Sequence, residues 1–355
     1  MKKFSPGILY GKELLALYED AKKNEYALPA VNVSGTNTIN AALEAAAAVN
    51  SPIIIQFSFE GAGFITGGRG LLNDFTANVK GAVSGALHVH NVVAYYGVPV
   101  VLHTDHANDQ LLPWVLQLIA EGEKFYAEKK FPLFSSHMTD LSAKSPDENL
   151  EISGSIFKQL VKLEMGIEIE LGVTGGIEGN IDNSRVASET LYTLPGDVAL
   201  AYSKMNKIGR LFTIAAAFGN VHGIYAPGHV ELKPVILNNC QQYIRETYHT
   251  EEKPAFFVFH GGSGSSLQQT REAIQYGCIK MNIDTDLQWA FWEGVKNYYN
   301  EFEPFLQSQL GNPGGSALPN KKYYEVKSWM RPGEKNYVKH LEEIYSNLNC
   351  INRNG

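Results

Sequence analysis

The fold is decided by the stretch VPVVLHTDH, residues 98–106, in which an apolar run ends abruptly in groups that bind metals or protons. Apolar, β-branched runs of this length predict strands that are buried on both faces. Two other runs have the same design, since Leu211–Phe218 leads to His222 and Phe256–Phe259 leads to His260. Polar groups at the carboxyl ends of several buried strands are typical of a parallel α/β active site.

Candidate strands alternate with helical patterns along the chain. The strands are expected at Ala27–Val33, Pro52–Ser58, Val98–His103, Pro132–His137, Gly166–Leu171, Phe212–Phe218, Ala255–His260 and Cys278–Asn282. Apolar residues at helical spacing are found at residues 39–49, 111–129, 149–165, 237–248, 266–276 and 287–306. This alternation predicts an α/β fold with a parallel sheet, and eight strands can close a (β/α)8 TIM barrel. A doubly wound open sheet is the alternative, but no GxGxxG motif follows the first strand, which weakens a dinucleotide-binding interpretation.

One break in composition divides the chain, the turn-rich segment GNPGGS at residues 311–316. We therefore expect a (β/α)8 barrel over residues 1–310 and a C-terminal extension over residues 311–355, packed on the barrel or at a dimer interface. The extension is locally basic. Such charge runs usually mark only a solvated helix or loop.

Composition excludes several classes of protein for this chain of 355 residues with a net charge of −7. No basic stripe suggests nucleic-acid binding. No apolar stretch approaches the ~18 residues of a membrane span, and the first residues do not form a signal peptide. Cys240, Cys278 and Cys350 are scattered without a CxxC motif, which fits a reducing compartment and argues against a cysteine-based zinc site. We expect a cytoplasmic protein.

Three histidines stand out because each follows a buried strand: His106, His222 and His260. Three imidazoles suit Zn²⁺, and a catalytic zinc keeps a fourth position open for water or substrate. His103 ends the same strand as His106 and competes with it for the ligand role. Spacing alone does not separate these two.

Acidic residues gather at the same strand ends. Glu168 and Glu170 alternate, so their side chains share one face of their strand. If that face is the barrel interior, a cation is implied, because acids are almost never fully buried without a partner. The simpler alternative is one acid paired with a lysine or arginine. Asp105, Asp140 and Asp284 add further acids near strand ends.

Two glycine-rich segments follow strands. The first, GGSGS at residues 261–265, precedes a helix, where converging backbone N–H groups and the helix dipole favour an anion. Barrel phosphate sites commonly use the loops after strands seven and eight. The second, TGGIEGN at residues 174–180, carries Glu178 on a loop that could close like a lid. An ordinary surface loop is the alternative for the second segment.

Several segments together closely resemble the class II, metal-dependent fructose-bisphosphate aldolases of the longer bacterial and fungal type. They are LHTDHA, LFSSHMTDLS, FGNVHG, FHGGSGS, KMNIDTDLQWA and NKKYY, within a resemblance that extends from Leu28 to near Trp329. It implies a lyase of glycolysis and gluconeogenesis that reversibly cleaves fructose 1,6-bisphosphate to dihydroxyacetone phosphate and glyceraldehyde 3-phosphate. Zinc then replaces the lysine Schiff base that Lys280 would otherwise suggest.

Other functions stay open at this point. A relative with the same mechanism could act on tagatose 1,6-bisphosphate or another ketose phosphate. A metal-dependent barrel hydrolase would often carry an HxH pair after its first strand, where this chain has Val31-Asn32-Val33. A non-catalytic binding barrel would not need so many acids around a metal.

The resemblance also implies roles for individual residues. His106, His222 and His260 match zinc ligands. Asp105 matches the acid that exchanges a proton with the C4 hydroxyl, and Glu178 matches the base that acts on dihydroxyacetone phosphate. Asp140 and Glu170 match residues that can hold a second divalent metal, with Glu168 behind the ligands. The residues that match the binding sites for substrate and for a monovalent cation, Na⁺ or K⁺, are Asn32, Ser58, Gly223, Gly261, Gly262, Ser263, Asn282, Ile283, Asp284 and Thr285.

Three positions depart from the family's pattern. Lys327 stands where relatives carry an arginine that grips the second phosphate from a neighbouring subunit, so a homodimer is implied. Ala226 replaces a lysine, and Ile177 replaces an acid beside Glu178. None of the three is a zinc ligand, but the first two bear on the substrate.

Overall fold

The computed structural model describes residues 3–67, 75–172, 175–178, 181–183, 191–222, 231–262 and 265–355. At residues 175–178, 181–183 and 221–222 it describes the backbone alone.

Eight parallel strands form a closed barrel. They are β2 (Leu28–Asn32), β3 (Ile53–Ser58), β4 (Pro99–Asp105), β5 (Ser136–Thr139), β6 (Gly166–Leu171), β9 (Phe212–Ala216), β11 (Phe257–Phe259) and β12 (Cys278–Ile283). Their order is β4-β3-β2-β12-β11-β9-β6-β5, and pairing of β4 with β5 closes the ring. The expected (β/α)8 barrel is confirmed, and the open sheet is excluded.

The fourth barrel strand begins later than the sequence predicts, at Ser136 instead of Pro132. A short N-terminal strand, β1 (Gly7–Ile8), explains the difference. It pairs in parallel with β4 at Pro99 and Val100, whereas β5 pairs with β4 only from His103 onward. The beginning of the chain therefore takes the part of the β4 edge that β5 does not reach.

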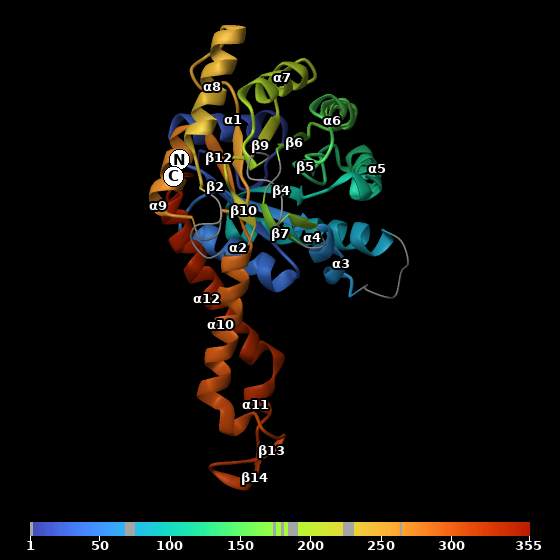
Figure 1. Ribbon diagram of the computed structural model, residues 1–355. Helices are drawn as coiled ribbons and strands as arrows, with labels where there is room; N and C mark the ends of the chain where they lie inside the picture. The colour runs from blue at the N-terminus through green and yellow to red at the C-terminus, as the bar shows by residue number, and fades with distance from the viewer. Residues whose placement is uncertain are drawn as a thin grey trace.

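Helices surround the barrel (Figure 1). They are α1 (Gly11–Lys23), α2 (Thr36–Ala48), α3 (Phe59–Ile65), α4 (Thr76–Tyr96), α5 (Leu112–Lys129), α6 (Pro146–Val161), α7 (Pro195–Asn206), α8 (Val235–Tyr248), α9 (Leu267–Gln275) and α10 (Thr285–Phe302). Capping boxes fix the starts of α6, through Ser145 and Glu148, and of α9, through Ser266 and Gln269. Every helix that apolar spacing predicts is present.

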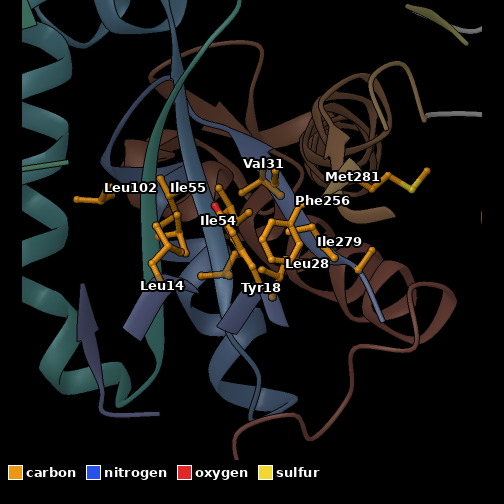
Figure 2. Packing of buried hydrophobic residues seen from close by; sticks show 14 of the residues in the cluster. Leu14, Tyr18, Leu28, Val31, Ile54, Ile55, Leu102, Phe256, Ile279 and Met281 are labelled. Atoms are coloured by element: carbon orange, nitrogen blue, oxygen red, sulfur yellow. The ribbon is translucent and has the colours of Figure 1, made fainter. Parts of the chain in front are cut away.

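The barrel core is apolar at the amino ends of the strands. Leu28 and Ile54 from neighbouring strands are fully buried, and Figure 2 shows them close to Tyr18 of α1. The Tyr18 ring lies 5.8 Å from the ring of Phe256, which directly precedes β11. Because α1 and these side chains fill this end, the polar groups are left to the carboxyl ends.

The C-terminal region forms an arm that extends away from the barrel in Figure 1. It comprises the distal part of α10, the 3₁₀ turn η3 (Glu303–Phe305), the antiparallel hairpin of β13 (Leu310–Asn312) and β14 (Gly315–Pro319), and α11 (Lys321–Tyr324). Helix α12 (Val326–Asn347) then returns and packs against α10 and α2. A Cβ at Gly333 would lie 2.8 Å from Phe291, so this glycine lets α10 and α12 approach closely.

None of the helices in the described part of the chain has the length and apolarity that crossing a membrane requires.

Candidate active site

Asp105 is the acid at the carboxyl end of β4, and its side chain is only 1% exposed. It accepts hydrogen bonds from the side-chain amides of Asn32 on β2 and Asn282 on β12, both at 3.1 Å. Asn32 in turn accepts a hydrogen bond from Gln56 of β3, which fixes the orientation of its amide. Side chains from four adjacent strands thus hold this carboxylate in one position.

His106 and His260 face each other across the strand ends. Their ring centroids lie 4.5 Å apart, with 62° between the ring planes. His106 has φ +44°, a backbone conformation that is uncommon outside glycine and that clusters at functional sites. Ligand atoms of Asp105, His106 and His260 all lie within 4.8 Å of one another. Two imidazoles and a carboxylate at this spacing form a donor set that zinc accepts.

A second acidic pair lies beside the two imidazoles. Glu170 Oε2 is 3.6 Å from His106 Nδ1 and 3.4 Å from His260 Nδ1. Asp140 Oδ2 is 3.8 Å from His106 Nδ1. His106, Asp140 and Glu170 form another group whose spacing can hold a metal ion. The catalytic metal and the second divalent ion that the resemblance implies would therefore each have donors at this spacing.

Electrostatics at the site favour a positive charge between these groups. Burial lowers the pKa of His260, but the nearby carboxylates of Glu170 and Glu168 outweigh it and raise the pKa to about 9. Burial raises the pKa of Asp140, but the hydrogen bond and charge of His106 and the contacts with Ser142 lower it to about 2. A divalent cation supplies the positive charge that protonated imidazoles would otherwise provide.

Glu168 lies deeper in the barrel and is 1% exposed. Lys280 Nζ donates to both of its carboxylate oxygens, at 2.9 and 2.8 Å, and His260 Nε2 lies 2.8 Å from Oε1. Burial alone would raise the pKa of Glu168, but Lys280 together with His103 and His260 holds it well below its usual range. The simpler alternative, one acid paired with a lysine, is therefore correct for Glu168. Glu170 instead lies beside His106 and His260.

His103 is placed differently from His106. Its Nδ1 makes a 2.8 Å hydrogen bond with Ser136 Oγ, and its Nε2 lies 3.6 Å from Glu168 Oε2. Burial and the charge of Lys280 lower its pKa to about 3. The structure brings His106, and not His103, into ring contact with His260, which favours His106 as the ligand.

A cavity of about 630 Å³ opens beside His106. Asn32, Ser58, His106 and Asp284 all contribute to its wall, as the expected binding roles require. Ser58 also caps α3 by accepting a 3.1 Å hydrogen bond from the backbone N–H of Gly61. The sequence gives no signal for the apolar part of the wall, formed by Leu287, Phe291, Met330 and Tyr337, because their spacing resembles ordinary helix packing.

The predicted phosphate-binding segments follow β11 and β12. Gly261 has φ +60°, and a Cβ at Gly262 would collide with Met281 of β12. Asn282 and Ile283 end β12, Asp284 follows, and Thr285 begins α10. Backbone N–H groups at the start of this helix lie at the carboxyl end of the barrel, where an anion would be bound.

Some predicted residues lie outside the described part of the chain. These are Gly223, Ser263 and Ala226, together with the side chains of Glu178, Ile177 and His222. The backbone of Ile177, Glu178 and His222 is described. Strand β7 (Gly175–Glu178) pairs in parallel with β10 (Val221–His222), His222 opposite Gly176, and antiparallel with β8 (Ile181–Asn183). Residues 175–178 of the glycine-rich segment are thus in a strand that pairs next to the His222 segment.

Lys327 lies at the beginning of α12, next to the arm. It is the second residue of α12, its side chain is 83% exposed, and its Nζ lies 3.2 Å from Glu325 Oε2. It is absent from the described residues that line the cavity.

Comparisons with known proteins agree across the whole length. The family described as "Fructose-bisphosphate aldolase class-II" matches residues 12–353. The "Fructose-bisphosphate aldolase class 2" of Escherichia coli strain K12 is 50% identical over 348 residues, 98% of this chain and 97% of that protein. The "Fructose-bisphosphate aldolase" of Borreliella burgdorferi is 51% identical over 357 residues, 100% of this chain and 99% of that protein. The crystal structure of fructose-bisphosphate aldolase from Campylobacter jejuni superimposes with a TM-score of 0.90 at 51% identity, covering 99% of this chain and 98% of that one.

Proposed function

Because the chain belongs to the class II fructose-bisphosphate aldolase family, we propose how its own residues carry out the reaction. The chain is a metal-dependent lyase that reversibly cleaves fructose 1,6-bisphosphate to dihydroxyacetone phosphate and glyceraldehyde 3-phosphate. The proposal concerns which side chains hold the metal, move the protons and bind the phosphates.

The metal is zinc, and its ligands are His106, His222 and His260. The observation that carries this assignment is the 4.5 Å approach of the His106 and His260 rings at the mouth of the barrel. A bound zinc acts as a Lewis acid for the negative charge that develops when the C3–C4 bond breaks. Asp140 and Glu170 offer a site for a second divalent ion, and the turn after β12 offers one for Na⁺ or K⁺.

Asp105 moves the proton of the C4 hydroxyl. During cleavage the carboxylate takes this proton while the C4–O bond becomes a carbonyl, and the electron pair of the C3–C4 bond remains on the dihydroxyacetone phosphate half. The amides of Asn32 and Asn282 hold the carboxylate in place for this transfer. In the reverse direction Asp105 returns the proton.

Cleavage assays on both C4 epimers test the activity. We expect chelator-sensitive cleavage of fructose 1,6-bisphosphate, restored by zinc. Faster cleavage of tagatose 1,6-bisphosphate would instead identify the alternative substrate, and chelator-insensitive cleavage would contradict a metal-dependent reaction.

Glu178→Gln is expected to retain zinc but to slow proton exchange at C3 of dihydroxyacetone phosphate by roughly 10²–10⁴-fold, the usual cost of losing a general base. The reason is that the amide has the shape of the acid but no basic oxygen. Release of isotope from C3-labelled dihydroxyacetone phosphate measures the exchange. Exchange at the wild-type rate would show that another group, with Asp284 as the first candidate, is the base.

Lys327→Ala is expected to raise KM for the bisphosphate without loss of zinc. We propose that the extension over residues 311–355 takes part in a homodimer and places Lys327 at the partner's phosphate site. Lysine keeps the charge of the family's arginine but lacks its two-pronged hydrogen bonding, so Lys327→Arg should bind at least as well. An unchanged KM in Lys327→Ala would mean that the exposed lysine is only part of a solvated surface.

The cytoplasm is the proposed location. Its support is the state of the cysteines, since Cys240, Cys278 and Cys350 are all free and buried in the structure, as expected in a reducing compartment.

A further inference from the structure

Lys280 has no part in the chemistry described so far, yet it is buried in the barrel beneath the site with 1% of its surface exposed. Its Nζ makes hydrogen bonds of 2.9 and 2.8 Å to the two oxygens of Glu168. A buried lysine in a carboxylate clamp is ion-paired, and an ammonium group has no free electron pair with which to attack a carbonyl. The arrangement therefore supports a role other than Schiff-base formation.

Glu168 connects Lys280 to His260. Its Oε1 lies 2.8 Å from His260 Nε2, and its Oε2 accepts a 3.3 Å hydrogen bond from Thr213 Oγ1 of β9. Because an ionised carboxylate only accepts hydrogen bonds, the proton between the two groups belongs to Nε2 of the imidazole. Nδ1 is therefore the nitrogen left to face a metal, and it lies 3.4 Å from Glu170 Oε2 on the His106 side of the site.

Lys280 is the main group that holds Glu168 against His260. Its Nζ donates to both carboxylate oxygens, whereas Thr213 Oγ1 donates only to Oε2, at 3.3 Å. Without Lys280 the carboxylate could rotate, and the His260 ring would lose the partner that orients it. His103 does not replace these bonds, since its Nε2 lies 3.6 Å from Glu168 Oε2.

We propose that Lys280 is a positioning residue for the metal site: through Glu168 it fixes the ring of His260 with Nδ1 turned toward the metal. This inference rests on the proposed ligand role of His260. Lys280 also pairs with Glu168 in a deeper group, His103, Asp105 and Glu168, whose ligand atoms are close enough to hold a metal ion. Its ammonium group already supplies a positive charge to this deeper group, so the divalent ion is directed to the outer one.

The test is a set of zinc dissociation constants, measured on purified full-length protein by competition with a chromophoric chelator. Lys280→Met is expected to weaken zinc binding roughly 10–100-fold, the usual effect of removing a group that orients a metal ligand. Glu168→Gln should weaken it by a similar factor. The double variant should be no weaker than Glu168→Gln, because Lys280 acts only through Glu168.

Lys22→Met is the matched control. Lys22 is also buried, 7% exposed, and paired with acids, since its Nζ lies 2.9 Å from Glu251 Oε1 and 3.0 Å from Glu19 Oε2 on the outside of the barrel. The same substitution there should lower the melting temperature and leave zinc affinity unchanged. If Lys280 had only a structural role, Lys280→Met would likewise lower the melting temperature and leave zinc affinity unchanged. The proposal would then be wrong.

Two further outcomes keep the test decisive. If Lys280→Met does not fold, the double variant Lys280→Met/Glu168→Gln is used, because both of its replaced side chains are neutral. Its zinc affinity is compared with that of Glu168→Gln, and a weaker affinity in the double variant overturns the proposal. His260→Ala separates this inference from the proposed function. Retention of zinc in His260→Ala rejects the ligand set itself, whereas loss of zinc there with wild-type affinity in Lys280→Met rejects only the role of Lys280.

Discussion

Zinc content and aldol cleavage are both expected to be lost when His260 is replaced by alanine. His106→Ala and His222→Ala should have the same effect, because a site built from three imidazoles leaves two when any one is removed. The three residues follow different strands, so no single segment can compensate. Metal analysis after dialysis, together with a cleavage assay at saturating zinc, measures both losses.

His137→Gln is the matched control for these variants. His137 is as buried as His260, but its Nδ1 is hydrogen-bonded to Thr104 Oγ1 at 2.8 Å and its ring packs 5.1 Å from that of Phe134. Its replacement should reduce stability and leave zinc content intact. Full zinc content and activity in any of the three alanine variants would reject that ligand, and His103 would be the first residue to test in its place.

Asp105→Asn is expected to lower kcat for cleavage by roughly 10²–10⁴-fold while zinc stays bound. Asparagine has the shape of the aspartate but cannot accept the C4 proton. It would also present an N–H group to Asn32 or Asn282, whose amides now donate to the carboxylate. Single-turnover cleavage of fructose 1,6-bisphosphate measures the effect on the chemical step.

Asp109→Asn provides the comparison for Asp105. Asp109 begins the 3₁₀ turn η1 (Asp109–Leu111), its side chain is 59% exposed, and it pairs with Lys144 at 3.1 Å. This variant should cleave at the wild-type rate. A wild-type rate in Asp105→Asn as well would assign the proton transfer to another group.

The barrel could be predicted from the sequence because buried parallel strands carry nearly continuous apolar runs. The late start of β5 could not, since it depends on β1, a two-residue strand with no periodicity of its own. The arm was expected only as an extension after the turn-rich segment. The arm includes the distal part of α10, and the aromatic spacing of this helix does not indicate where it leaves the barrel.

The kind of site was predicted from the sequence, but not every residue that contacts its members. Strand ends gave His106 and His260, yet the choice between His103 and His106 rests on the ring contact of His106 with His260, which no sequence pattern specifies. Alternation placed Glu168 and Glu170 on one face, but their partners come from distant strands. Lys280 lies 112 positions from Glu168, and only the closed barrel brings the two together.

The central claim is most directly tested by the position of zinc itself. Crystals of the zinc-loaded protein, measured at the zinc absorption edge, would give an anomalous peak that locates the ion without assumptions about its ligands. The account predicts one strong peak about 2.0–2.1 Å from a ring nitrogen of each of His106, His222 and His260. A peak held instead by His103, Asp105 and Glu168, with Lys280 displaced, would contradict it.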